Sequence, residues 1–177
     1  MSNSITEECF LITKDDYVHM MLDRKKFFTP KENKIILRIL GIIAVCSGVA
    51  AFINIRESVY QTICWILLIL IGFYALSYYD VICPSQIRKN ASKFYEANSK
   101  FLQNALTLHV GDELFELTSE MHKVCVPQRY IYKIIEGKNT ILVFFDKNEY
   151  CFIPKRAVNE NDIRQIVSFA GDKYRKL

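Results

Sequence analysis

The stretch IILRILGIIAVCSGVAAFINI (residues 35–55), RES (56–58) and VYQTICWILLILIGFYALSYY (59–79) decides the fold of this 177-residue chain. A run of 21 residues at the rise of an α-helix covers about 31 Å, close to the thickness of a bilayer's hydrocarbon core. The first run contains one charge, Arg38, whose long stem can carry its guanidinium to the head groups. Because only three polar residues separate the two runs, we expect a transmembrane helical hairpin with spans 35–55 and 59–79.

Positive charge is concentrated on the two flanks of this hairpin. Residues 24–38 hold six cations against one acid, and residues 81–100 hold four against one. The positive-inside rule therefore predicts that both termini are cytoplasmic and that the short loop lies outside. These flanking cations act either as topology signals or as a binding surface for anionic lipid head groups, and both interpretations stand. The candidates for binding are Arg24, Lys25, Lys26, Arg88 and Lys89.

The segments outside the spans divide by pattern. Residues 1–34 begin with a β-prone run and continue with a helix that Thr13 caps, with Asp16 at its third position. Pro30 should end this helix. Residues 80–103 read as a basic amphipathic helix with Pro84 in its first turn. This helix either packs on the soluble domain or lies in the membrane interface.

From residue 104 the apolar pattern changes to a period of two. We expect about five antiparallel strands over residues 104–153, with a hairpin turn at 137–139. Asn159 should cap a closing helix with Asp162 at its third position. The apolar stripe predicted for this helix consists of Ile163, Ile166, Val167, Ala170 and Tyr174. Residues 104–177 then form a small bent sheet whose open end the helix covers.

Small residues recur on one face of the first span. They are Gly41, Ala44, Gly48 and Ala51. Such a face permits close approach of a second helix. It either closes the hairpin within one chain or supports self-association or docking to another membrane protein.

Motifs for chemistry are missing from the sequence. It has no P-loop, no dinucleotide fingerprint, no His-Glu-x-x-His and no nucleophile elbow. The three histidines and six cysteines are scattered and show no ligand-like spacing. We therefore expect no enzyme activity, no cofactor and no metal site. The nearly neutral charge of residues 101–177 argues against nucleic acid as a partner.

Short motifs in the right order make the chain resemble the YcxB-like bacterial membrane proteins. The sharpest are Val143-Phe144-Phe145 and Ile153-Pro154-Lys155-Arg156-Ala157, and further likeness lies in Phe10-Leu11-Ile12-Thr13, the paired spans and the Pro84 helix. In that family a Trp often enters the middle strand, where this chain has Tyr130. The resemblance implies a pleckstrin-homology-like barrel at the C-terminus and carries over no catalytic residue.

In such a barrel, cations at strand ends can form a rim that faces head groups or a partner. The candidates are Arg129, Lys133, Lys155 and Arg156; the alternative is that they are solvated turn residues. The sequence thus predicts an α+β, non-enzymatic, multi-pass protein of the bacterial cytoplasmic membrane. Its cytoplasmic domain would bind a partner protein or the anionic leaflet. The alternative functions are an immunity-type protein against a membrane-active peptide and an accessory subunit of a transporter. The expected partner is the lipid bilayer, with a membrane protein or a second copy of this chain as further candidates.

Overall fold

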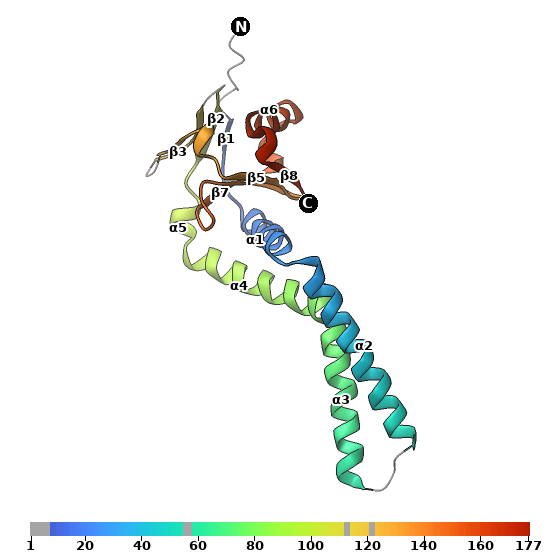
Figure 1. Cartoon of the computed structure of the whole chain (residues 1–177). Helices are drawn as coiled ribbons and strands as arrows, with labels where there is room; N and C mark the ends of the chain where they lie inside the picture. The colour runs from blue at the N-terminus through green and yellow to red at the C-terminus, as the bar shows by residue number, and fades with distance from the viewer. Residues whose placement is uncertain (1–7, 55–57, 112–113, 121–122) are drawn as a thin grey trace. The chain divides into compact units, whose positions relative to one another are not determined.

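The computed structural model describes residues 8–54, 58–111, 114–120 and 123–177. The chain divides into two compact units (Figure 1). Residues 28–87 form one, here called the hairpin unit. Residues up to Phe27 together with Arg88–Leu177 form the other, here called the β-domain. The fold is α+β, as predicted, and the two units are described separately.

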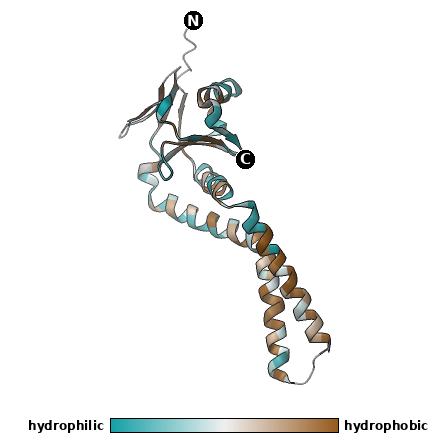
Figure 2. Ribbon diagram, in the orientation of Figure 1, coloured by the Kyte–Doolittle hydropathy of each residue, from teal (hydrophilic) through white to brown (hydrophobic). Residues whose placement is uncertain are grey.

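Two apolar helices make up most of the hairpin unit. They are α2 (Lys31–Asn54) and α3 (Val59–Ser77). Both are long and apolar enough to cross a membrane, and only 11% and 6% of their most apolar windows are buried within the protein. A core helix of a soluble protein would bury most of such a window. Figure 2 shows the apolar colour running along both helices. Residues 55–57 of the predicted spans and loop lie outside the described residues.

A π-helical turn, Tyr78–Ile82, connects α3 to α4 (Cys83–Ala97) without a break. The backbone N–H of Cys83 donates to the carbonyl of Tyr78, five residues earlier. Pro84 follows directly and has no N–H to donate, so it would leave a gap in a regular α-helical ladder. The wider turn accommodates Pro84. The expected basic exit helix is therefore present, but it continues the second apolar helix.

Two four-stranded sheets form the β-domain (Figure 1). The first has the order β1 (Glu8–Phe10), β2 (Leu106–Val110), β3 (Leu114–Ser119), β4 (Lys123–Pro127), all antiparallel. The second has the order β7 (Tyr150–Pro154), β6 (Thr140–Phe144), β5 (Lys133–Glu136), β8 (Tyr174–Lys176). Here β8 pairs with β5 in parallel, so this sheet is mixed. Since β1 pairs with β2, the whole helical segment between them is an insertion into one domain.

The helices of the β-domain begin where the sequence predicts. At the start of α1 (Lys14–Phe28), the hydroxyl of Thr13 accepts from the Asp16 N–H at 3.2 Å, and the Asp16 carboxylate accepts from the Thr13 N–H at 2.8 Å. The same reciprocal box joins Asn159 and Asp162 at α6 (Glu160–Ala170). A four-residue helix, α5 (Ser99–Leu102), precedes β2.

The end of α6 corrects the prediction for Tyr174. The helix stops at Ala170 because Gly171 adopts a positive φ of 53°, which only glycine takes easily. A 3₁₀ turn, Gly171–Lys173, then leads into β8. Tyr174 consequently belongs to β8 and not to the apolar stripe of the helix.

Both faces of the second sheet are covered, and β6 shows it most clearly. All five of its residues are buried, although a strand with one wet face would alternate. Thr140 and Phe144 contact Asp23 and Phe27 of α1, so alternate residues of β6 face this helix. The others, Ile141 and Val143, face the shared core, which includes Leu108 and Phe115 of the first sheet. The N-terminal helix α1 thus covers one face of the sheet formed by β5 to β8.

Candidate functional site

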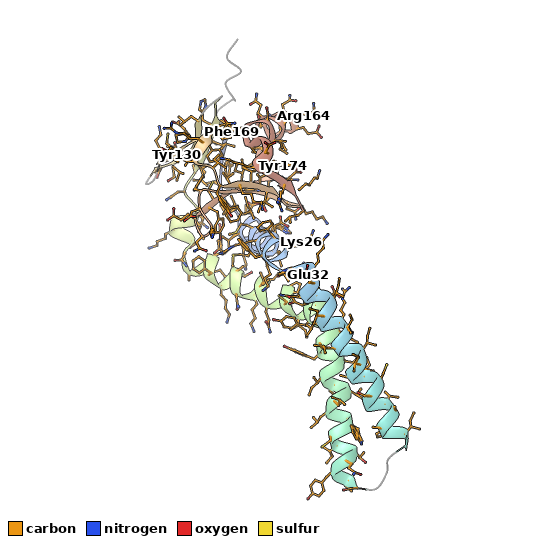
Figure 3. The ribbon with its side chains drawn as sticks, in the orientation of Figure 1. Lys26, Glu32, Tyr130, Arg164, Phe169 and Tyr174 are labelled. Atoms are coloured by element: carbon orange, nitrogen blue, oxygen red, sulfur yellow. The ribbon has the colours of Figure 1, made fainter. Side chains whose placement is uncertain are left out.

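The four cations predicted to share a strand-end rim do not converge. Strand register places them at opposite ends of the second sheet: Lys133 pairs with Phe144, whereas Pro154, next to Lys155, pairs with Thr140. The structure separates Lys155 and Arg156 from Lys133. Arg129 lies in a 3₁₀ turn (Gln128–Tyr130) before β5. It is exposed, and its guanidinium lies 4.9 Å from the ring centroid of Tyr130, which Figure 3 labels.

Arg156 binds the carboxylate of Asp16. Its Nε lies 2.9 Å from Oδ1 and its Nη2 lies 2.5 Å from Oδ2, while Nη2 also donates to the Leu11 carbonyl at 2.7 Å. Burial alone would raise the pKa of Asp16, but hydrogen bonds from Arg156 and Thr13 outweigh it and hold the pKa below its usual value. Arg156 therefore fastens the start of α1 to the end of β7.

Lys155 forms an ion pair with a second buried acid, Glu136. The Glu136 carboxylate accepts hydrogen bonds from Lys155 and from the Tyr174 hydroxyl, and Lys176 lies 3.7 Å away. Burial would raise the pKa of Glu136, but these donors lower it overall. Burial, together with Glu136, raises the pKa of Tyr174 to about 12. Glu136, Lys155 and Lys176 line an open groove of about 470 Å³ beside Ile163 and Val167 of α6.

A different set of cations gathers where α1 ends. Three rings form what we call the aromatic shelf: Phe27, Phe144 and Tyr150. The Phe27 and Phe144 centroids are 6.3 Å apart, and those of Phe144 and Tyr150 are 5.3 Å apart. The Arg24 guanidinium lies 4.7 Å from the Tyr150 centroid, and the Lys133 ammonium lies 4.5 Å from that of Phe27. Cation–π contacts hold both side chains in place and leave their charge intact.

Three further cations lie on the same elements or on the neighbouring strand. Lys25 and Lys26 are exposed in the last turn of α1, and Lys26 is labelled in Figure 3. Arg175 of β8 pairs with Ile135, two residues along β5 from Lys133, so both cations stand on the face that α1 covers. Burial and the neighbouring Arg175 charge lower the pKa of Lys133. We call Arg24, Lys25, Lys26, Lys133 and Arg175 the α1-end cluster.

Sequence reasoning found four members of this cluster but missed Arg175. Its position depends on the parallel pairing of β8 with β5, which no local sequence pattern predicts. The predicted cations Arg88 and Lys89 are exposed on α4. Among the described residues, no group of three or more His, Cys, Asp or Glu side chains is arranged to hold a metal ion.

The small residues predicted for helix packing face α3 within the hairpin unit. A Cβ on Gly41 would lie 2.9 Å from Leu76 Cγ, and one on Gly48 would lie 2.7 Å from Ile69 Cγ1. Ala44 and Ala51 are half-buried. Sequence reasoning missed Gly72 of α3, whose Cβ would lie 2.6 Å from Val45 Cγ2 and 2.9 Å from the Gly41 carbonyl oxygen. Glycines on both helices thus permit the close approach that closes the hairpin.

Comparison with known proteins identifies one segment. Residues 129–170 match the family model described as YcxB-like protein. The matched segment runs from the turn before β5 to the end of α6 and contains both of the sharpest motifs, Val143-Phe144-Phe145 and Ile153-Pro154-Lys155-Arg156-Ala157. No curated protein and no solved structure matches the chain. Over residues 129–170, the chain is therefore similar to the YcxB-like proteins.

Proposed function

We propose that this chain is a non-enzymatic integral membrane protein of the bacterial cytoplasmic membrane. Two spans anchor a cytoplasmic domain of pleckstrin-homology type, and that domain binds a partner protein or the anionic leaflet. The proposal rests mainly on one observation: the helical hairpin is inserted between two strands, β1 and β2, that pair with each other.

Insertion between paired strands constrains the topology. The chain leaves the β-domain through α1, forms two apolar helices and returns through α4 to the same domain. A domain cannot be divided by a bilayer, so both ends of the hairpin must emerge on one side. Two spans satisfy this condition, and the cations before and after them support the cytoplasm as that side.

Helix surfaces support insertion into lipid. Large apolar side chains of α2 and α3 are exposed over their whole lengths, for example Ile42 at 53% and Leu70 at 57%. Leaving so much apolar surface in water is unfavourable, whereas lipid accommodates it. Arg38 and Asp80 form an ion pair of 2.7 Å near the cytoplasmic ends of the helices, which allows the Arg38 charge to be tolerated there.

The strand order supports the pleckstrin-homology type. Four strands in one sheet are followed by three antiparallel strands in a second sheet and then by a C-terminal helix whose apolar residues join the common core. In this domain Arg156 and Lys155 form internal ion pairs with Asp16 and Glu136, respectively. The α1-end cluster is therefore the better candidate for external contacts.

Topology can be tested with an impermeant maleimide. Ser58 is exposed between the helices, and Cys125 is exposed on β4. In intact spheroplasts we expect the reagent to label the Ser58→Cys variant and not the wild type. In inverted vesicles the wild type should be labelled through Cys125. Labelling of the wild type in spheroplasts would place the β-domain outside, and release of the protein by alkaline carbonate would contradict membrane insertion.

Partner binding can be tested by affinity purification from gently solubilised membranes. The wild type is compared with a Lys26→Gln/Arg175→Gln variant, whose two side chains are exposed. The matched control is Lys147→Gln/Arg164→Gln, which removes the same charge from exposed positions elsewhere in the domain. A protein recovered with wild type and control only would identify a protein partner. Recovery of all three forms without a partner would favour the leaflet as the ligand.

A further inference from the structure

We infer that the α1-end cluster is a binding site for the phosphate head groups of anionic phospholipids in the cytoplasmic leaflet. This inference rests on the proposed function, because it requires the hairpin to lie in a membrane. It deepens that proposal by naming the ligand and the residues.

Charge complementarity carries the first step. Arg24 and Lys133 lie over the rings of the aromatic shelf, and Arg175 lies near Lys133 on the same face of the sheet. Lys25 and Lys26 precede the shelf residue Phe27 in the last turn of α1, so three separate elements supply the five cations. None of the ion pairs within the described residues involves Lys26, Lys133 or Arg175. The cations of the opposite sheet end behave differently, since Lys155 and Arg156 each hold a buried carboxylate. One end of the sheet pairs its cations with buried carboxylates, whereas Lys26, Lys133 and Arg175 at the other end are in none of these ion pairs.

Pre-organisation carries the second step. The helix dipole favours Lys25 and Lys26 in the last turn of α1, but it does not explain cations supplied by β5 and β8. Lys133 is half-buried over Phe27, and its pKa is lowered by burial and by Arg175. The folded β-domain thus holds two like charges, Lys133 and Arg175, close together. A phosphate bound between them would reduce their mutual repulsion. Rings under Arg24 and Lys133 reduce the side-chain freedom that binding would otherwise remove.

The third argument is the short connection between α1 and α2, which favours a membrane lipid over free phosphate as the source of the phosphate group. α1 ends at Phe28 and α2 begins at Lys31, so only two residues separate the cluster's helix from the helix that enters the bilayer. Two or three residues reach about 11 Å at most. A polybasic group tethered so close to a span meets head groups at high local concentration. Free phosphate in the cytoplasm has no such advantage.

The test measures lipid binding to the full chain in detergent micelles. Short-chain phosphatidylglycerol is titrated, with phosphatidylcholine of the same chain length and inorganic phosphate as separate arms, and bound lipid is counted by native mass spectrometry. The cluster variant is Lys26→Gln/Lys133→Gln/Arg175→Gln. The matched control is Arg129→Gln/Lys147→Gln/Arg164→Gln, which removes three exposed charges from other parts of the same domain.

We expect phosphatidylglycerol to bind the wild type in preference to phosphatidylcholine. The cluster variant should bind it about 100-fold more weakly, since each cation near an anionic surface contributes about fivefold. The affinity of the control variant for phosphatidylglycerol should differ from that of the wild type by less than about threefold. Arg175→Gln alone, at an exposed position outside the aromatic shelf, should reduce the affinity for phosphatidylglycerol about fivefold. This single variant keeps the test valid if the triple variant misfolds.

Three results would overturn the inference. These are equal losses in the cluster variant and the control, equal binding of the two lipids, and inorganic phosphate that displaces phosphatidylglycerol at comparable concentration. Each of these leaves membrane insertion and topology intact. Failure of the proposed function is recognised separately, by carbonate extraction and maleimide labelling.

Discussion

Arg156 and Asp16 lie 140 residues apart in the chain and form a two-point ion pair, with Nε 2.9 Å from Oδ1 and Nη2 2.5 Å from Oδ2. Asp16 also caps α1 through Thr13. The Asp16 side chain is 9% exposed and that of Arg156 is 51% exposed. The Asp16 carboxylate therefore joins the start of α1 to the turn that follows β7.

Breaking this pair should destabilise the β-domain. We expect Asp16→Ala to lower the free energy of unfolding by about 2–3 kcal/mol, because it removes both a cap and the partner of Arg156. Arg156→Ala should cost about 1–2 kcal/mol, less than for a fully buried pair, because the guanidinium is half-exposed. Chemical denaturation of the full chain in detergent measures both. The double variant should cost no more than about Asp16→Ala alone; strict additivity would show that the two residues do not interact.

A methyl group at Gly137 should be poorly tolerated. Its Cβ would overlap Oδ2 of Asp23, which accepts a hydrogen bond from the Thr140 hydroxyl at 2.8 Å. We expect Gly137→Ala to cost about 2–3 kcal/mol through displacement of α1 from the β5–β6 turn. Gly111→Ala is the control, because its Cβ would meet nothing closer than 3.8 Å. Equal stability of the two variants in thermal unfolding would contradict this packing.

Bulk at Gly72 should open the helical hairpin. Its Cβ would lie 2.6 Å from Val45 Cγ2, so Gly72→Leu forces α2 and α3 apart and should cost about 1–3 kcal/mol. We expect a lower temperature of aggregation for the detergent-solubilised chain. Cys46→Leu places similar bulk on the exposed face of α2 and should leave that temperature unchanged. The same drop in both variants would indicate that hairpin closure does not depend on Gly72.

Acid should weaken the β-domain through Asp16 and Glu136. Both have a pKa lowered below the unfolded value of about 4, so the folded state favours their charged forms. Their contribution is present above the unfolded pKa and is lost as the pH falls through the folded pKa. The free energy of unfolding, measured from pH 6 downward, should fall less steeply for Asp16→Asn/Glu136→Gln than for the wild type. The exposed Asp172→Asn variant should keep the wild-type slope.

Local signals carried much of the prediction. The capping residues Thr13 and Asn159, the stop at Pro30, the turn at 137–139 and the two apolar runs all depend on neighbours in sequence, and each appears where expected. Such features follow from backbone hydrogen bonding and side-chain periodicity within a few residues. The end of α6 was missed because the positive φ of Gly171 outweighed the apolar period that continued to Tyr174.

The candidate site was predicted only in part, because charge type is visible in a sequence and pairing is not. Lys155, Arg156 and Lys133 looked equivalent as strand-end cations. Register sends the first two to buried acids and leaves the third over Phe27. Arg175 was missed because β8 pairs with a strand about forty residues earlier, in parallel.

The sequence by itself determined the two long apolar helices, the cations at their flanks and the α+β class, because each depends on composition and period over a short window. Only the tertiary structure decided that β1 pairs with β2 across the whole hairpin, that α1 covers the second sheet, and which cations remain at the end of α1. Those outcomes depend on contacts between residues far apart in the chain. They form because burying both faces of β6 removes apolar surface from water.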